Sequence, residues 1–180
     1  MFSGRTWTLL TPLQLRKLAY KVINSTTKLL PAWKACLKEH QVPESLIPRD
    51  CSTRWDSTYD MCDYAEKHKK PLKAYLADDA HTFELESFGL SGQEWRCVRQ
   101  LRNPLKQATL FFSRGDTPNL ASVIPAMDRL DRELATFCTD DKLEPSIRAA
   151  ANIAKSTLNR YYSKTDDSDV YRIAMGAWIC

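Results

Sequence analysis

The sequence predicts an all-α protein, folded as an irregular antiparallel bundle of helices. Three observations favour helices over strands. Only 5 of the 180 residues are glycine, fewer than a fold built on many tight turns requires. Leucine, alanine, lysine and arginine, which favour helices, are abundant. Apolar residues also recur every three or four positions, whereas no alternating apolar and polar run extends beyond a few residues.

Composition indicates one folded domain without a membrane segment. The chain is 43% hydrophobic and 27% charged, as in ordinary globular proteins. No apolar run approaches membrane-spanning length, and the first residues lack a secretory signal, so no membrane partner is expected. The six cysteines form no Cys-x-x-Cys pair and lack suitably spaced histidines. Reduced thiols and no zinc site are therefore expected.

The first expected helix covers residues 11–40. Thr11 is expected to cap it, with Pro12 at the first helical position and Gln14 completing a capping box. Pro31 should kink this helix or restart it. The helical period is carried by Leu15, Leu18, Val22, Thr26, Leu29 and Trp33.

An extended segment and a second helix are expected next. Pro43 and Pro48 favour an extended chain over residues 41–49. The helix should begin around Asp56. Four lysines lie late in it, interrupted by Pro71. They suit a helix C-terminus through its dipole, and they could alternatively follow a DNA backbone. This lysine group consists of Lys67, Lys69, Lys70 and Lys73.

Three further helices complete the expected bundle. Ser91 and Glu94 form a predicted capping box at the start of the first. The second should start at residues 117–118, and the third should cover about residues 142–162. Residues 170–175 are expected to form a short last helix, before a divergent tail at residues 176–180.

Positive charge is concentrated in the first part of the chain. Residues 1–75 hold 13 lysines and arginines against 7 acidic residues, a net charge of +6, whereas the remainder has a net charge of −2. A surface that contacts phosphates would have such an excess. An ordinary solvated helix surface is the alternative explanation.

Arg54 and Trp55, the Arg-Trp pair, stand in the most distinctive run, residues 48–61. The tryptophan could be a wedge in a helical core with the arginine lying along it, an interpretation that general burial statistics favour. The alternative is a nucleic-acid contact. In that case the guanidinium binds a phosphate while the indole stacks on an exposed base.

The run Ser52-Thr53-Arg54-Trp55-Asp56-Ser57-Thr58-Tyr59-Asp60-Met61 resembles the STRW(N/D)STY-x-M signature of the hAT (hobo/Activator/Tam3) transposases and their domesticated relatives. Asp56 stands where many relatives carry asparagine. The likeness extends over roughly residues 13–175. Its other blocks are residues 13–33, the lead-in Ile47-Pro48-Arg49-Asp50, residues 111–118 and Asn159-Arg160-Tyr161-Tyr162.

The resemblance implies a role in handling DNA in the nucleus. Arg54 and Trp55 match the family's pair, which implies contact with the transposon end where a base is displaced during hairpin formation. Family members use three acidic residues on an RNase H-like fold to hold two Mg²⁺ ions. These residues lie outside the matched blocks, so no catalytic residue or metal ligand is carried over. Asp50, Asp56 and Asp60 belong to the motif without being implied ligands.

The resemblance also implies an incomplete transposase. The chain resembles the helical stretch inserted between catalytic elements, adjacent to a missing RNase H-like core. The family's N-terminal zinc-binding BED finger and C-terminal dimerisation segment have no counterpart. Residues 176–180 replace the expected continuation. We therefore expect a truncated or degenerate copy that needs no cofactor, since Mg²⁺ is expected only in the full-length family.

Three hypotheses follow. The first is a non-catalytic fragment that contacts transposon-end DNA through the Arg-Trp pair and the lysine group. The second is a helical interaction module, a transposase-derived relic that docks onto full-length transposase without binding DNA. The third is a metal-dependent nuclease, which requires converging carboxylates. Asp166, Asp167 and Asp169 are candidates, although a helix N-cap explains them better.

Overall fold

The chain is all-α, as the sequence predicted. The computed structural model describes residues 7–51, 55–79, 85–112, 123–166, 169–170 and 173, with the backbone alone for residues 7–11, 55, 103–105, 107–112 and 166. No strand occurs in these ranges. The elements are α1 (Trp7–Asn24), α2 (Leu29–Glu39), α3 (Trp55–Lys67), α4 (Lys69–Ala77), the 3₁₀ turn η1 (Glu86–Phe88), α6 (Gly92–Phe112), α7 (Val123–Thr139) and α8 (Pro145–Asp166).

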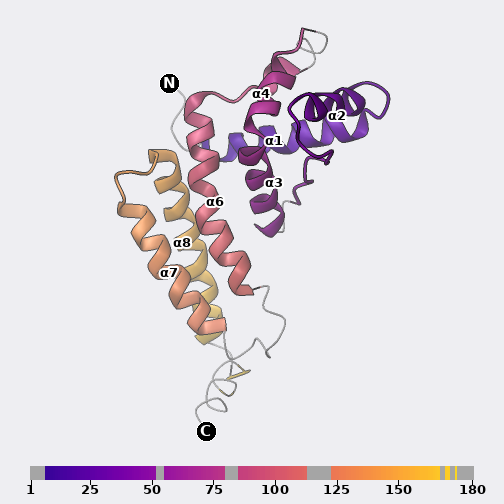
Figure 1. Cartoon of the computed structure of the whole chain (residues 1–180). Helices are drawn as coiled ribbons and strands as arrows, with labels where there is room; N and C mark the ends of the chain where they lie inside the picture. The colour runs from indigo at the N-terminus through magenta and orange to yellow at the C-terminus, as the bar shows by residue number, and fades with distance from the viewer. Residues whose placement is uncertain are drawn as a thin grey trace.

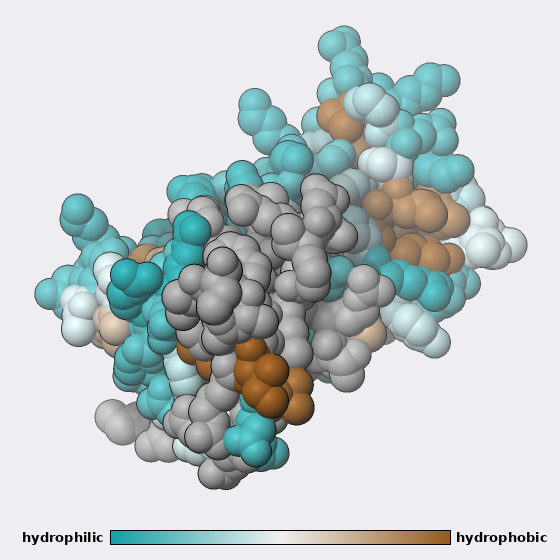
Figure 2. Space-filling model, turned by 90° about the horizontal axis from the view of Figure 1, so that it is seen from below, coloured by the Kyte–Doolittle hydropathy of each residue, from teal (hydrophilic) through white to brown (hydrophobic). Residues whose placement is uncertain are grey.

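Helix α6 is the central element of the bundle. Figure 1 shows it between α2, α3 and α4 on one side and the antiparallel pair α7 and α8 on the other, with α1 crossing behind it. It contacts α1, α3, α7 and α8. None of the helices among the described residues is long and apolar enough to span a membrane. Seen from below, the described surface is mainly hydrophilic, and hydrophobic side chains gather in a few separate places (Figure 2).

The segment expected over residues 11–40, with a kink or restart at Pro31, forms two helices, and the expected helix start at Thr11 was wrong. Helix α1 begins at Trp7, which places Pro12 inside the helix instead of at its start. The chain breaks after Asn24, where the Ser25 hydroxyl accepts a hydrogen bond from the Leu29 amide at 3.2 Å. The expected restart at Pro31 is confirmed. This proline is the third residue of α2, where the missing N–H has no intrahelical partner to lose.

The second expected helix is also divided. Helix α3 ends at Lys67, and α4 begins at Lys69 with Pro71 as its third residue. The lysine group therefore lies at the junction. A favourable interaction with a helix C-terminus applies to Lys67 alone, because Lys69 and Lys70 are in the first turn of α4, where the helix dipole disfavours cations.

Residues 42–51, between α2 and α3, form no helix and are called the extended segment. The main core joins this segment to α1, α2, α3, α4 and α6. Trp33 is fully buried and donates its indole N–H to the Ser45 carbonyl at 3.2 Å. Its ring meets Tyr75 edge-on, with centroids 5.3 Å apart, and the Tyr75 hydroxyl donates to the Leu29 carbonyl at 2.9 Å. The largest fully buried side chains here are Trp33, Leu18, Leu29, Leu37, Ile47, Met61, Leu72, Leu85, Val22, Val98 and Cys62.

The α7–α8 hairpin is attached to α6 through the loop at its tip. Arg96 donates to Glu144 at 2.7 Å, and Gln93 donates to the same carboxylate at 3.1 Å. The Glu144 amide donates to the Gln100 side chain at 2.8 Å. The hydrogen bond from Arg96 lowers the pKa of Glu144. A small second set of buried residues lies beneath this loop and along the hairpin, namely Cys97, Ala126, Met127, Ile147 and Ala151.

Helix α6 begins with the predicted capping box. The Ser91 hydroxyl accepts from the Glu94 amide at 3.2 Å, and the Glu94 carboxylate accepts from the Ser91 amide at 2.7 Å. Two backbone donors at the helix start are thereby satisfied reciprocally.

We predict that Ser91→Ala lowers the free energy of unfolding by about 1 kcal/mol, because the Glu94 amide loses its acceptor. Urea denaturation followed by circular dichroism measures the change. The control is Ser163→Ala, at an exposed position within α8, where a shift of at most about 0.5 kcal/mol is expected. Equal losses in the two variants would contradict a capping role for Ser91.

Candidate nucleic-acid interface

The carboxylate of Asp50 lies at the centre of a buried polar cluster beside the start of α3. It accepts hydrogen bonds from the Nε and Nη2 atoms of Arg16, the former at 2.8 Å. The Ser57 and Thr58 hydroxyls donate to its other oxygen at 3.0 and 2.8 Å. We call Arg16, Asp50, Ser57 and Thr58 the Asp50 cluster. It joins α1, the extended segment and the first turns of α3.

The free-energy cost of burying the Asp50 charge is offset by its ion pair and hydrogen bonds. The Asp50 side chain has no exposed surface, whereas that of Arg16 is 35% exposed. A buried charge is tolerated when it is paired and hydrogen-bonded. Here one guanidinium neutralises the carboxylate and two hydroxyls occupy its remaining acceptor positions, so a charge is stable inside the fold.

In the second half of the motif, residues 57–61, the side chains of Ser57, Thr58 and Met61 face the interior, whereas Asp60 is exposed. Ser57 additionally accepts from the Cys51 amide at 2.8 Å, which ties the end of the extended segment to α3. Met61 is fully buried in the main core. Burial also raises the pKa of the neighbouring Cys62 thiol to about 12. These residues of the motif therefore have a folding role.

The two predicted DNA contacts of the motif are placed only through the backbone. Trp55 is the first residue of α3, and Arg54 lies outside the described residues, as do Ser52 and Thr53. The position of the pair in the fold is defined on both sides, by Cys51 before it and Ser57 after it.

The lysine group lies at the other end of α3 from the Arg-Trp pair. Helix α3 is 13 residues long, and a rise of roughly 1.5 Å per residue separates its ends by about 18 Å. Figure 1 shows α4 at the end of α3 that is remote from its first residue. The predicted site residues thus form two groups on one side of α6, not one continuous patch.

The four lysines differ in how far they are engaged. Lys67 pairs with Asp63 at 2.7 Å, and the ammonium of Lys69 lies 4.7 Å from the centre of the Trp95 ring. Lys70 and Lys73 are exposed. Among the described residues, no ion pair is seen for either of them, so their charges are the more available to a polyanion.

Ion pairs fix α3 against α6 in an antiparallel register. Arg99 pairs with Glu66 and Arg102 with Asp63, both at 3.0 Å. Lys106, one turn further along α6 than Arg102, is exposed. Sequence reasoning did not identify this lysine or Arg16. Arg16 lies 34 residues from its partner Asp50, and no local pattern indicates a pairing over that separation.

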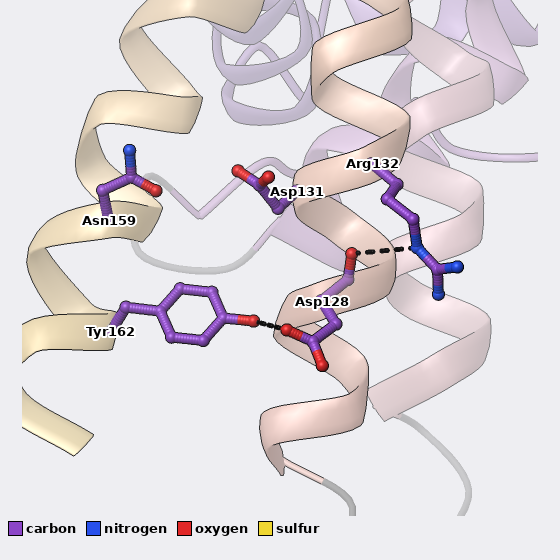
Figure 3. Close-up of a pocket in the computed structure, with 5 residues that line it drawn as sticks. All are labelled: Asp128, Asp131, Arg132, Asn159 and Tyr162. Carbon is purple, nitrogen blue, oxygen red and sulfur yellow. Dashed lines mark hydrogen bonds between the residues drawn. The ribbon is translucent and has the colours of Figure 1, made fainter. Parts of the chain in front are cut away.

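A shallow polar groove lies between α7 and α8. Its volume is about 480 Å³, and its lining comprises Asp128, Asp131, Arg132, Asn159 and Tyr162. Figure 3 shows Tyr162 reaching across from α8 to Asp128 on α7, with which its hydroxyl forms a hydrogen bond. Asp131 pairs with Lys155 of α8 at 2.7 Å. Both carboxylates thus serve to hold the hairpin together.

The described residues contain no group of three histidine, cysteine, aspartate or glutamate side chains arranged to hold a metal ion. The described acidic residues Asp50 and Asp60 of the motif do not converge on one site either. Asp50 is enclosed by its four hydrogen bonds, and Asp60 is exposed on α3. Of the three carboxylates considered for a nuclease, Asp167 lies outside the described residues, as does the side chain of Asp166.

Comparison with protein-family models gives a match over residues 13–103 to the ZBED1 RNase-like helical domain. The matched range contains most of α1, all of α2, α3 and α4, and the first part of α6. It includes the whole Asp50 cluster and ends before the α7–α8 hairpin. Searches among curated proteins and among solved structures gave no match.

We predict that Asp50→Ala lowers the free energy of unfolding by about 3 kcal/mol, because Arg16 loses its counter-charge and two hydroxyls lose their acceptor. Urea denaturation measures the loss. Asp60→Ala is the control, an exposed aspartate of the same motif, on α3, for which at most about 0.5 kcal/mol is expected. A loss as small as that of the control would show that the cluster does not stabilise the fold.

Proposed function

The chain belongs to the family of the ZBED1 RNase-like helical domain, a hAT-related, transposase-derived domain, and we propose that it is a DNA-handling module without catalytic activity. In this proposal Arg54 binds a backbone phosphate, and Trp55 stacks on a displaced base. The DNA is a hairpin or splayed end of the kind that transposition produces, and the module acts in the nucleus.

The observation that carries the proposal is the Asp50 cluster. It anchors the chain at Cys51, three residues before Arg54, and at Ser57, two residues after Trp55, since Ser57 bonds to Cys51 and to Asp50. A contact residue whose flanks are already ordered loses less entropy on binding. A fold that buries a charged cluster at this point is thus suited to present the pair to a ligand.

The lysine group supports a longer contact along the same DNA. Lys67, the first of the four, lies about 18 Å from the start of α3, a distance that corresponds to about five base pairs of B-form duplex. Lys70 and Lys73, both exposed on α4, are the better phosphate contacts of the four. Lys67 and Lys69 already interact with Asp63 and Trp95 and would contribute less.

Neither a cofactor nor DNA cleavage is part of this proposal. The family's Mg²⁺-binding acids are implied by resemblance to lie outside the matched blocks, so binding should be the same with Mg²⁺ and with EDTA. A well-folded chain that binds no DNA would favour the interaction module instead. That alternative is tested by light scattering of the chain mixed with a full-length hAT transposase.

We predict that Trp55→Ala and Arg54→Ala each raise the Kd for a labelled DNA hairpin with a splayed end. For the stacking residue, a loss of about 1–3 kcal/mol corresponds to roughly a 5- to 150-fold increase. Fluorescence anisotropy measures the Kd. Tyr161→Ala and Arg132→Ala are matched controls in the hairpin, outside the family match, and should bind as the wild type does.

The stability of the same variants separates a binding role from a core role. A Trp55→Ala variant that loses several kcal/mol of unfolding free energy would indicate a buried indole, and would contradict the stacking role. An unchanged Kd for Trp55→Ala would also contradict it.

We predict that the double variant Lys70→Ala/Lys73→Ala weakens duplex binding and makes it less sensitive to salt. Losing two phosphate contacts should reduce the slope of log K against log salt concentration by about 1.8. Anisotropy titrations at several salt concentrations measure this slope. Lys142→Ala/Lys164→Ala, two exposed lysines of the hairpin region, should leave the slope unchanged. Equal slopes for all three proteins would remove α4 from the interface.

A further inference from the structure

One row of side chains on α1 runs beside the segment that leads to the Arg-Trp pair. Arg16, Tyr20 and Asn24 are spaced by four residues and therefore share one face of the helix. At one end Arg16 bonds to Asp50. At the other end Arg49 donates to the Asn24 side chain at 3.2 Å. Residues 49–50 consequently lie alongside α1, and Tyr20 stands between the two bonded positions.

Tyr20 is unusually open for a large aromatic residue. It is 66% exposed, more than Tyr161 of α8 at 58%. Its backbone carbonyl accepts from the Asn24 side chain at 2.9 Å, which fixes the helix turn without covering the ring. The aromatic face is thus offered to solvent within the part of the chain that the family match covers.

The surroundings of Tyr20 are positively charged. Lys17 is exposed and precedes it by three residues, so the two are neighbours on the helix surface. Arg49, which binds Asn24 one helix turn after Tyr20, is also exposed. Helix α1 has no acidic residue, and the nearby Asp50 side chain is fully buried against Arg16. Among the described residues, neither Lys17 nor Arg49 pairs with a carboxylate.

The Asp50 cluster brings this surface close to the Arg-Trp pair. The Asp50 carboxylate, which accepts hydrogen bonds from Arg16 on α1, also accepts hydrogen bonds from the Ser57 and Thr58 hydroxyls in the first turns of α3. Helix α3 begins at Trp55. The Asp50 side chain therefore connects the face of α1 that carries Tyr20 to the start of α3, where Trp55 lies.

We propose that Tyr20, Lys17 and Arg49 form a second subsite for single-stranded DNA, adjoining the Arg-Trp pair. The Tyr20 ring stacks on one unpaired base, and the two cations bind the flanking phosphates, the combination by which proteins hold single strands. Duplex DNA does not fill this subsite, because its bases are stacked on one another. This inference rests on the proposed function and extends it to the strand that continues from the displaced base.

The test compares a labelled single-stranded oligonucleotide of ten nucleotides with a duplex of the same sequence, by fluorescence anisotropy on the full chain. Tyr20→Ala should raise the Kd for the single strand by roughly 5- to 150-fold and leave that for the duplex within about twofold. Tyr20→Phe should bind as the wild type does, because stacking needs the ring and not the hydroxyl. Tyr161→Ala is the matched control.

The two cations have their own readout. Lys17→Ala and Arg49→Ala should each reduce the salt slope for the single strand by about 0.7, whereas Lys164→Ala should not change it. Asn24→Ala removes the side-chain partner of Arg49 without removing a charge, so it should leave the slope unaltered.

Different failures point to different conclusions. Single-strand binding by Tyr20→Ala equal to the wild type, together with weakened hairpin binding by Trp55→Ala, would overturn the second subsite and leave the proposed function standing. An equal loss on single strand and duplex would also overturn stacking by Tyr20. A wild-type chain that binds neither hairpin nor single strand would overturn both proposals.

Discussion

The buried ion pair between Arg16 and Asp50 is the constraint on which the arrangement of α1 and α3 depends. A carboxylate without exposed surface must keep its counter-charge and its hydrogen bonds, and its four donor groups come from two helices. The extended segment can therefore cross α1 in one position and enter α3 in one position. The main core then fills the space beneath, with Ile47 from this segment buried beside Met61 of α3.

Helix α6 joins this unit to a second one of different character. Toward α3 it offers Arg99 and Arg102 to acidic partners. Toward the hairpin its side chains surround Glu144. The hairpin buries fewer residues than the main core, and its groove carboxylates bind partners within the hairpin. The family match covers the first unit, which is built around Asp50, and ends within α6.

Local signals in the sequence predicted what local interactions determine. The Ser91 and Glu94 capping box spans three residues, and Pro31 and Pro71 each lie in the first turn of a new helix. The start of α1 was not predicted, because Pro12 is accommodated inside the helix. The partnership of Arg16 with Asp50 spans 34 residues and depends on the path of the intervening chain. The openness of Tyr20 likewise depends on where residues 49–50 lie, which periodicity does not specify.

Within the transposase-like motif, the structure shows which residues the fold itself engages. Ser57 and Thr58 are committed to Asp50, and Met61 to the core. These positions would be required in any protein that keeps this crossing of α1 and α3, whether or not it binds DNA. A resemblance over the whole motif is thus partly a resemblance of fold. The contacts proposed for DNA are the remainder, the Arg-Trp pair, together with the acid-free face of α1. A function for this chain must therefore be argued from charge and exposed aromatic surface, because the internal half of the motif is explained by stability alone.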